Sequence, residues 1–337
     1  MKQTRVLMCI AIILFLFTVI PGVQAEMFRY NASHSGDYSP VAGSTAPNNI
    51  LKWNYTTAAG VLSSPAVVDD VVYVGSYDGN VYAIDAITGD FKWGQYAGMV
   101  YSSPAVVNNI VYVGSTDSNV YALYAQTGFV KWSHPLGDEI WSSPSVVGNV
   151  VYIGCADNHT YALDADSGNE KWNFTTGHHV FSSPAVVNNV VYVGGKDEKI
   201  HAINATSGVE KWNKTTLDEV WSSPSVVGNI VFVGSLDGNV YALYADSGDQ
   251  KWKTYLSNAV LSSSPAVVDD VVYVGTADGK VHALDADTGA ESIWSTPFPT
   301  GGSIESSPSV ANGIVYVGSD DNKTYAIYAV NGTKKWS

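Results

Sequence analysis

Apolar residues along this chain occur in short runs that are separated by pairs of polar, turn-forming residues. After Ser102-Ser103-Pro104, for example, the runs AVV, IVYVGS and VYALYA are separated by Asn108-Asn109 and Asp117-Ser118, and Thr127-Gly128 comes before a final VKW. Runs of this length between such residues are typical of β-strands and too short for α-helices. Asn, Asp and Gly also tolerate the positive φ angles that two-residue hairpins require. The pattern therefore predicts four short strands in succession, each antiparallel to the one before.

This unit recurs along almost the whole chain. In each copy the second and third strands are apolar at nearly every position, so both faces of the sheet require cover. Sheets that pack side by side in a ring cover one another. The sequence thus predicts an all-β fold, a β-propeller of seven four-stranded antiparallel blades, as a single domain over residues 50–337. The Ser-Ser-Pro triplets are 39 to 43 residues apart, with their prolines at Pro65, Pro104, Pro144, Pro184, Pro224, Pro265 and Pro308.

A segment before the first unit bears on how the ring closes. Ile50 to Tyr55 matches the fourth strand of the unit, although no first three strands precede it. We expect it to pair with the last sheet, so that the N- and C-terminal segments share one blade. The last unit already has a fourth strand of its own, from Lys334 to Trp336. Two possibilities are open: a seven-bladed ring in which the segment adds to or displaces that strand, which we favour, and an eight-bladed ring that lacks three strands.

The first 25 residues have the features of an export signal. Lys2 and Arg5 precede an apolar run from Val6 to Ile20, and the small residues that end at Ala25 fit a signal peptidase site. We expect cleavage there, residues 26–49 as a lead-in segment, and a mature protein that is secreted or held at the cell surface. The alternative is that the run is kept as a membrane anchor. Sequons compatible with glycosylation begin at Asn31, Asn54, Asn158, Asn173, Asn204, Asn213, Asn322 and Asn331.

The charge of the chain excludes one class of partner. Asp and Glu total 31 against 17 Lys and Arg, which gives a formal charge of -14, and the only arginines are Arg5 and Arg29. Nucleic acid requires arrays of cations that neutralise its phosphates. We therefore expect a monomer that binds a protein or another component of the cell envelope, and no nucleic acid.

The end of each unit carries an eleven-residue pattern. Its clearest copy is Ala83 to Trp93, of the form A-x-D-x-x-T-G-x-x-x-W. The pattern is similar to the tryptophan-docking motif of the quinoprotein alcohol dehydrogenases, and to the repeats of BamB-like outer-membrane assembly proteins and archaeal PQQ-like surface proteins. This resemblance implies a PQQ-like β-propeller whose indoles are buried between adjacent blades. The tryptophans that would dock in this way are Trp53, Trp93, Trp132, Trp172, Trp212, Trp252, Trp294 and Trp336.

The same resemblance raises the question of an enzyme. In the quinoprotein dehydrogenases it would imply a quinone cofactor, a calcium ion, a catalytic aspartate and a disulfide between adjacent cysteines. Cys155 is the only cysteine after the export signal, so that disulfide cannot form, and the repeats contain no arginine to bind the carboxylates of the quinone. We therefore predict a non-enzymatic binding or scaffold module without a cofactor. A PQQ-dependent dehydrogenase and a carbohydrate-binding or carbohydrate-active propeller are the alternatives.

One set of loop residues is a candidate binding surface. The residue before Ser-Ser-Pro is aromatic in four successive units, and three of these units carry an acid or a histidine two positions earlier. The loops that bear these residues are expected at the mouth of the central channel. We call the seven residues the aromatic-acidic crescent: Tyr101, Trp141, Phe181, Trp221, Glu139, His179 and Glu219.

Two interpretations of the crescent are open. Aromatic rings offer rigid contact area and carboxylates attract cations, so it would suit a ligand or a cationic peptide. Alternatively, the rings fill space between first strands and the charges are solvated loop tips. Carboxylates and imidazole are also possible ligands of a divalent metal, but repetition alone aligns Glu139, His179 and Glu219, and we predict no metal site.

We expect the other repeated polar side chains to have structural roles. One turn aspartate recurs in every unit, and a bond from its side chain to the backbone is sufficient reason for it. The paired serines are expected to line part of the channel with hydroxyls, and no Ser-His-Asp spacing marks one of them as a nucleophile. Cys155 is expected to be a buried residue without a chemical role.

Overall fold

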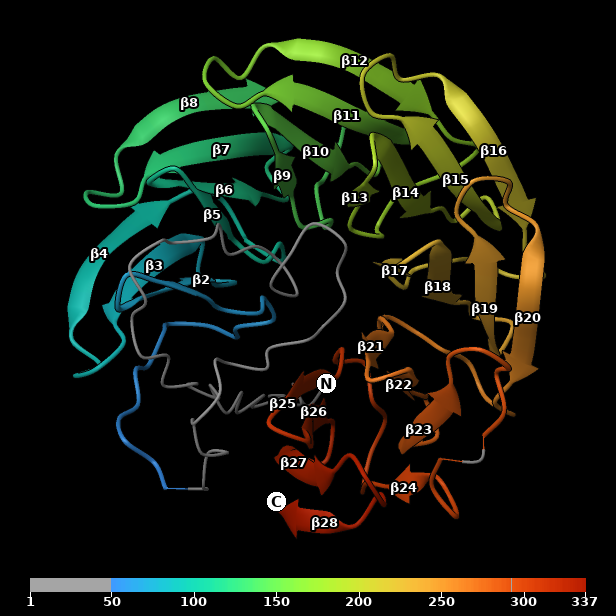
Figure 1. Cartoon of the computed structure of the whole chain (residues 1–337). Helices are drawn as coiled ribbons and strands as arrows, with labels where there is room; N and C mark the ends of the chain where they lie inside the picture. The colour runs from blue at the N-terminus through green and yellow to red at the C-terminus, as the bar shows by residue number, and fades with distance from the viewer. Residues whose placement is uncertain (1–49, 292) are drawn as a thin grey trace, which may run out of the picture.

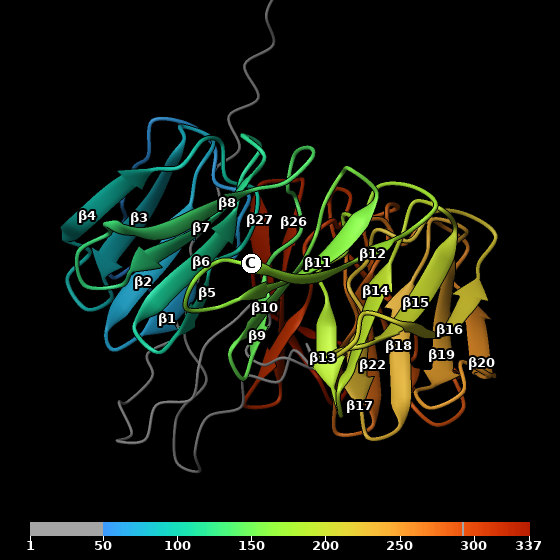
Figure 2. The same ribbon diagram turned by 90° about the horizontal axis from the view of Figure 1, so that it is seen from above.

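The computed structural model describes residues 50–291 and 293–337, and within these ranges it contains 28 β-strands and no helix. The strands form seven four-stranded sheets, in which each strand is hydrogen-bonded to the next along the chain. Figure 1 shows the sheets around a central axis, with the first strand of each sheet innermost and the fourth at the rim. In Figure 2 the strands run between the two faces of the ring, where the loops gather. The structure confirms the prediction of a seven-bladed all-β propeller with antiparallel blades.

Each blade is one continuous stretch of chain. Blades 1 to 4 consist of β1 (Ala66–Val68), β2 (Val71–Gly75), β3 (Asn80–Asp85), β4 (Phe91–Tyr96); β5 (Ala105–Val107), β6 (Ile110–Gly114), β7 (Asn119–Tyr124), β8 (Val130–Pro135); β9 (Ser145–Val147), β10 (Val150–Gly154), β11 (His159–Asp164), β12 (Glu170–Thr175); β13 (Ala185–Val187), β14 (Val190–Gly194), β15 (Lys199–Asn204) and β16 (Glu210–Thr215). Blades 5 to 7 consist of β17 (Ser225–Val227), β18 (Ile230–Gly234), β19 (Asn239–Tyr244), β20 (Gln250–Tyr255); β21 (Ala266–Val268), β22 (Val271–Gly275), β23 (Lys280–Asp285), β24 (Phe298–Pro299); β25 (Ser309–Ala311), β26 (Ile314–Ser319), β27 (Lys323–Tyr328) and β28 (Lys334–Trp336).

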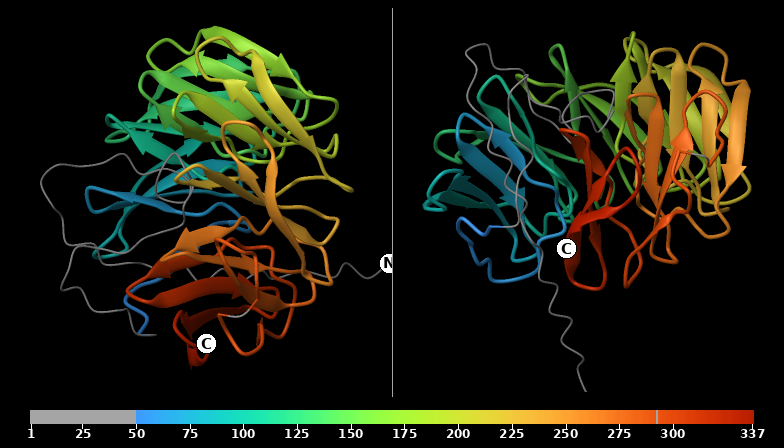
Figure 3. Two further views of the ribbon diagram at one scale, coloured as in Figure 1. Left: turned by 45° about the vertical axis from the view of Figure 1, so that its right-hand side comes forward. Right: turned by 60° about the horizontal axis from the view of Figure 1, so that its bottom comes forward.

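The expected export signal, residues 1–25, and the lead-in segment, residues 26–49, lie outside the described residues. No helix within the described ranges is long and apolar enough to cross a membrane. The described chain begins at Ile50, and Figure 3 shows from two directions that its first residues lie on the side of the ring where blade 7 also lies.

The hydrophobic core lies between the blades. At the junction of blades 4 and 5, Ala185, Tyr192 and Trp212 of blade 4 pack against Val231 and Leu243 of blade 5, and all five are buried. Equivalent clusters span the other junctions from blade 1 to blade 7. Burying one large apolar side chain contributes about 1.5–3 kcal/mol, so each blade depends on its neighbours for stability.

One tryptophan at each of these junctions reaches into the next blade. Trp212 Nε1 donates a hydrogen bond of 3.0 Å to the carbonyl of Ala245, and the indole lies directly over Gly248, which has a φ of +75°. Trp294 docks in the same way although it precedes the short outer strand β24. The same bond, 2.8–3.1 Å long, joins Trp53, Trp93, Trp132, Trp172, Trp252 and Trp294 to Ala86, Ala125, Ala165, Ala205, Ala286 and Ala329.

The paired serines join the inner strands, and the pairs of blades 2 to 6 are buried, whereas Ser64 and Ser306 are exposed. Ser183 N donates to Oγ of Ser223 in the next blade at 2.9 Å, and Oγ of Ser182 accepts the N–H of Gly194 in its own blade at 3.0 Å. The bond between blades repeats without a break from Ser64 to Ser307. In blades 2 to 6 the expectation that these hydroxyls line the channel is wrong, because the serines there are buried and accept hydrogen bonds from backbone N–H groups.

The junction between blades 7 and 1 is different. The expected pairing of the N-terminal segment with the last sheet is not found in the described residues, because β28 already occupies the outer edge and pairs with β27. Instead, Trp53 and Tyr55 pack on blade 1, while the face of blade 7 belongs to a separate cluster with Trp336. Within the described ranges, the buried Nε1 of Trp336 has no hydrogen-bond partner. Trp336 therefore departs from the docking that its motif implies, whereas Trp53, which precedes blade 1, docks on that blade through its bond to Ala86.

Candidate functional site

The loops that enter blades 3, 4 and 5 carry most of the crescent, and the repeated turn aspartates hold them in place. Asp237, in the turn between β18 and β19, accepts the N–H of Asn239 at 2.8 Å and the N–H of Leu217, in the loop before Trp221, at 3.1 Å. Asp157 and Asp197 hold the N–H groups of Gly137 and Gly177 in the two preceding loops at 2.8 and 3.0 Å. The side chain to backbone bond expected of these aspartates is present, and it also fixes the loops of the crescent.

The aromatic residues of the crescent form one unbroken row of rings. Tyr101 and Trp141 are stacked with centroids 4.5 Å apart and an interplanar angle of 13°, and Trp141 and Phe181 are stacked at 5.1 Å and 21°. Phe181 meets Trp221 edge to face at 5.8 Å and 82°. Tyr77 extends the row at 4.3 Å from Tyr101. The side chain of Trp141 is 38% exposed, so the middle of the row is open to solvent.

Each acid of the crescent is bonded to an indole. Trp141 Nε1 donates to Glu139 Oε2 at 2.8 Å, and Trp221 Nε1 donates to Glu219 Oε2 at 2.6 Å. His179 lies between the two acids in the order of the blades, and its ring contacts Phe181 edge to face at 5.6 Å. No group of three or more His, Cys, Asp or Glu residues within the described ranges could hold a metal ion. The carboxylates thus orient the rings and place negative charge beside them.

A lysine completes one end of the row. Lys196, in the turn between β14 and β15, places its Nζ 5.3 Å from the centre of the Phe181 ring and 5.1 Å from that of Trp221. The same Nζ lies 3.3 Å from Glu219 Oε2. Cation–π contacts of this kind gain strength when the charge is partly removed from water. Lys196 and Tyr77 were not among the predicted residues, and their signal is weak: both precede a repeated turn aspartate, where other blades carry Thr, Ala, Leu or Asp.

Cys155 is buried beneath the loop that bears Glu139 and Trp141. Its Sγ lies 3.2 Å from the carbonyl oxygen of Asp138. Burial raises the pKa of the thiol to about 12. A thiol with this pKa is not a nucleophile near neutral pH, so the cysteine contributes packing only.

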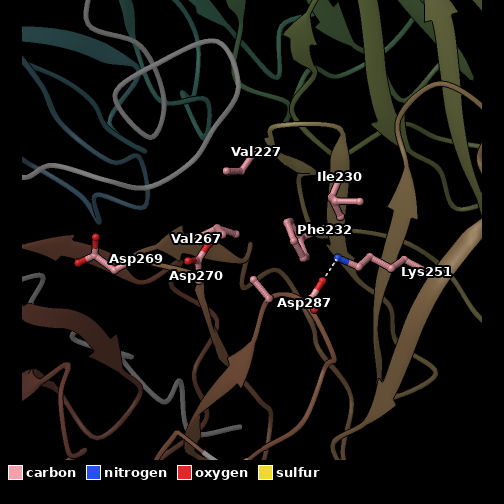
Figure 4. A pocket seen from close by; sticks show the side chains of 9 residues that line it. Val227, Ile230, Phe232, Lys251, Val267, Asp269, Asp270 and Asp287 are labelled. Atoms are coloured by element: carbon pink, nitrogen blue, oxygen red, sulfur yellow. Dashed lines mark hydrogen bonds and ion pairs between the residues drawn. The ribbon is translucent and has the colours of Figure 1, made fainter.

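A pocket of about 440 Å³ lies between blades 5 and 6. Figure 4 shows Phe232, Ile230 and Val267 on its walls, with the ion pair of Lys251 and Asp287 at one side. The pocket is lined by the hairpin turns at the ends of the first strands, whereas the crescent lies where those strands begin, so the two are on opposite faces of the ring. Its one cation is already paired at 2.5 Å, which makes the pocket a weaker candidate than the crescent.

The turn aspartates also make the stability of the crescent loops depend on pH. Burial alone would raise the pKa of Asp237, but hydrogen bonds from the Tyr241 hydroxyl, at 2.5 Å, and from backbone N–H groups outweigh burial and lower this pKa. The unfolded-state pKa of Asp is about 3.9. The folded pKa lies below it, so the ionised carboxylate stabilises the fold above that pH, and this stabilisation is lost as the pH falls through the folded pKa.

We therefore expect Tyr241→Phe to lower the free energy of unfolding by about 1.5–3 kcal/mol at pH 7, and this difference from wild type to shrink below about pH 4. Urea titrations at pH 7, 5, 4 and 3 measure it. Tyr244→Phe, at an exposed tyrosine on the same strand, is the control. A difference of equal size at pH 7 and pH 3 would contradict the role given to the Asp237 bond.

The donor set for a pyrroloquinoline quinone is not present. Its carboxylates need cations, and the described ranges contain no arginine. Lys196 is the lysine at the crescent, and it is already paired with Glu219. The other lysines in ion pairs bond to turn or strand-end aspartates, at Lys92, Lys131, Lys171, Lys251, Lys280 and Lys323. The residues that the structure describes therefore do not fit this cofactor.

Comparison with known proteins identifies relatives of the fold. A search of curated protein sequences found no match. BamB from Moraxella catarrhalis superposes with a TM-score of 0.69 at 20% identity, over 81% of this chain and 86% of that one. The computationally designed Ika8 protein gives a TM-score of 0.74 at 20% identity, over 83% and 87%. The quinohemoprotein alcohol dehydrogenase from Comamonas testosteroni gives 0.76 at 16% identity, over 92% and 72%. At these identities the similarity establishes the fold alone.

A family model extends this to the sequence. The model described as outer membrane protein assembly factor BamB matches residues 32–139, 97–215 and 237–337. These matches cover most of the chain, including the loops that bear Tyr101, Trp141 and Phe181, whereas Glu219 and Trp221 lie between the second match and the third. The chain therefore belongs to the BamB-like family of PQQ-like β-propeller repeat proteins.

Proposed function

We propose that the protein is a non-enzymatic binding module of the cell surface, whose aromatic-acidic crescent captures a cationic protein segment. The observation that carries this proposal is the continuous row of rings from Tyr101 to Trp221, with carboxylates bonded to two of its indoles. A row of this kind offers rigid contact surface whose order is already set before a ligand binds. The export signal expected over residues 1–25 supports the proposed location.

Charge favours a cationic segment over other occupants. Asp138 and Asp218 are exposed next to Glu139 and Glu219, and each bonds the backbone N–H of its neighbour at 2.8 Å. Lys196 is the one lysine in the described residues that contacts the row of rings, and Glu219 neutralises it. The surface around the rings is therefore negative, which speeds the approach of positive partners and repels negative ones. The relatives support a protein partner, since the family model is described as an assembly factor.

Synthetic peptides of graded charge test the proposal. We expect 12-residue peptides with four lysines to be retained by the immobilised protein, and neutral or acidic peptides of the same length not to be. Trp141→Ala combined with Trp221→Ala is expected to weaken retention at least about tenfold, because aromatic anchors dominate such contacts. Phe129→Ala, at a ring that is 70% exposed in the turn between β7 and β8, is the matched control. Thermal unfolding of each variant checks that the ring remains folded.

Three results would contradict this function. The first is retention that does not depend on peptide charge, and the second is equal retention by the double variant and the control. The third is electron transfer to a dye after addition of quinone and calcium, which would establish the dehydrogenase. Binding of a neutral glycan that the same tryptophans control would favour the carbohydrate reading in place of a cationic protein segment.

A further inference from the structure

Two steps of the ring share the same types of residue and the same bond between indole and carboxylate, although their ring pairs differ in angle. Between blades 2 and 3, Tyr101 faces Trp141, and Trp141 Nε1 bonds Glu139 Oε2. Between blades 4 and 5, Phe181 meets Trp221 edge to face, and Trp221 Nε1 bonds Glu219 Oε2. Each step therefore presents two aromatic rings and a carboxylate that is fixed by the second ring.

The step between blades 4 and 5 already holds an alkylammonium group. The side chain of Lys196 is only 20% exposed, and that of its partner Glu219 is 29% exposed. Its Nζ contacts both rings of the step as well as the carboxylate. An ammonium group enclosed by two rings and a carboxylate is a common form of cation recognition in proteins. Lys196 thus shows, within the molecule, which kind of ligand this arrangement accepts.

The equivalent residue between blades 2 and 3 is Thr116. The equivalence rests on the backbone: Thr116 N donates to the carbonyl of Met99 at 3.0 Å, and Lys196 N donates to the carbonyl of His179 at 2.9 Å. Threonine is short and uncharged, so it leaves the carboxylate without a cation. No lysine or histidine within the described ranges forms an ion pair with Glu139.

The step between blades 3 and 4 does not repeat the arrangement. There the turn residue is Ala156, with its N–H bonded to the carbonyl of Glu139 at 3.0 Å, and the position of the acid is taken by His179. An imidazole is not a fixed anion, so this step lacks the charge that pairs with Lys196 one blade further on. Only one of the three steps combines a carboxylate with a vacant cation position.

We propose that Glu139, with Tyr101 and Trp141, is a subsite for one lysine side chain of the partner, and that Lys196 is an internal occupant of the equivalent subsite at Glu219. This inference rests on the proposed function and narrows it to a single contact. Trp141 is partly exposed and Met99, beside the row, is 48% exposed, so an incoming side chain reaches this subsite from solvent.

Exchange of the two turn residues tests the subsite. Thr116→Lys supplies the vacant position with its own lysine, and Lys196→Thr empties the occupied one. The probe is an acetylated and amidated pentapeptide, Gly-Ser-Lys-Ser-Gly, and the same peptide with acetyl-lysine is the uncharged control. The Nε1–H signals of Trp141 and Trp221 in a protein with ¹⁵N-labelled tryptophan report each subsite separately, because these atoms bond the two carboxylates.

In the wild type we expect the probe to shift the Trp141 signal in a saturable way and to leave that of Trp221 unchanged. In Thr116→Lys the apparent Kd at Trp141 is expected to rise at least about tenfold, as for loss of one charged contact. In Lys196→Thr the Trp221 signal is expected to begin responding. Ser133→Lys and Lys211→Thr make the same changes of charge at exposed positions on β8 and β16 and are expected to behave as wild type.

Two outcomes would overturn the inference. One is an equal response of Trp141 in Thr116→Lys and Ser133→Lys, which would reduce the effect to net charge. The other is an absence of any response to the lysine pentapeptide. If tetralysine 12-residue peptides are still retained in a manner that depends on Trp141 and Trp221, the proposed function stands and only this subsite fails. If that retention is also absent, both fail.

Discussion

Trp212→Ala is expected to lower the free energy of unfolding by about 3–5 kcal/mol, the range seen when a buried large side chain is truncated to alanine. The indole of Trp212 is buried between blades 4 and 5, and its Nε1 bonds the carbonyl of Ala245. The substitution therefore removes apolar contact, leaves a cavity and takes away one of the two donors to the Ala245 carbonyl, which keeps the bond from the Tyr192 hydroxyl. The lost contacts lie between blades 4 and 5, so the substitution destabilises both blades.

Trp336→Ala is the matched variant. Trp336 contacts Tyr316 with tilted rings as Trp212 contacts Tyr192, with centroids 5.9 and 5.8 Å apart, but no bond from its Nε1 to a further blade is present in the described residues. We expect Trp336→Ala to lower the free energy of unfolding by less than half as much as Trp212→Ala does. Urea unfolding followed by circular dichroism measures both. Equal losses of unfolding free energy would show that the tryptophans stabilise the fold through contacts within a blade and not through contacts between blades.

Gly168→Ala is expected to lower the free energy of unfolding by at least about 2 kcal/mol more than Gly148→Ala does. Both glycines lie in blade 3, and both have positive φ angles, +74° and +59°. A Cβ at Gly168 would lie 2.7 Å from Cδ2 of Trp132, whereas one at Gly148 would meet nothing within 4 Å. Both variants carry the cost of a left-handed alanine, about 1–2 kcal/mol. The difference between them therefore measures how closely the indole of the preceding blade packs on the turn.

The same unfolding experiment separates the two effects. Tryptophan fluorescence is expected to change in Gly168→Ala, because the ring of Trp132 must move, and to stay as in wild type in Gly148→Ala. If the two variants lose equal stability, backbone strain alone accounts for the glycines, and the close packing of Trp132 has no energetic weight.

The blades could be predicted from the sequence because their determinants are local. Two-residue turns such as Asn108-Asn109, with φ of 50° and 62°, end each strand at a fixed place, and the strands between them have one register that buries both faces. The crescent could also be located, because equivalent positions in successive blades are neighbours in a ring. Trp141 and Phe181, 40 residues apart in the chain, stack for this reason.

Other features depend on geometry between blades, which periodicity does not contain. The bond between Ser183 and Ser223 depends on the distance between inner strands of neighbouring blades, which the repeat pattern does not give. The reach of Lys196 to Glu219 requires the directions of two loops. Trp53 packs on blade 1, but the repeat pattern is equally compatible with pairing of its segment with blade 7. In each case the sequence shows the residue that forms the contact, but it does not show which residue of another blade or loop is contacted.

The direction of the contacts between blades has a consequence for the history of the protein. Each blade donates its indole and its serine N–H to the blade that follows, with the same atoms at every described junction from blade 1 to blade 7. A closed ring fixes the number of its units, since the last must match the first. In the described residues these contacts are not repeated between blades 7 and 1, where Trp53 packs on blade 1 and Trp336 belongs to a separate cluster on blade 7. Because the contacts from one blade to the next repeat, a forty-residue unit inserted between two of these blades would find matching contacts on both of its sides.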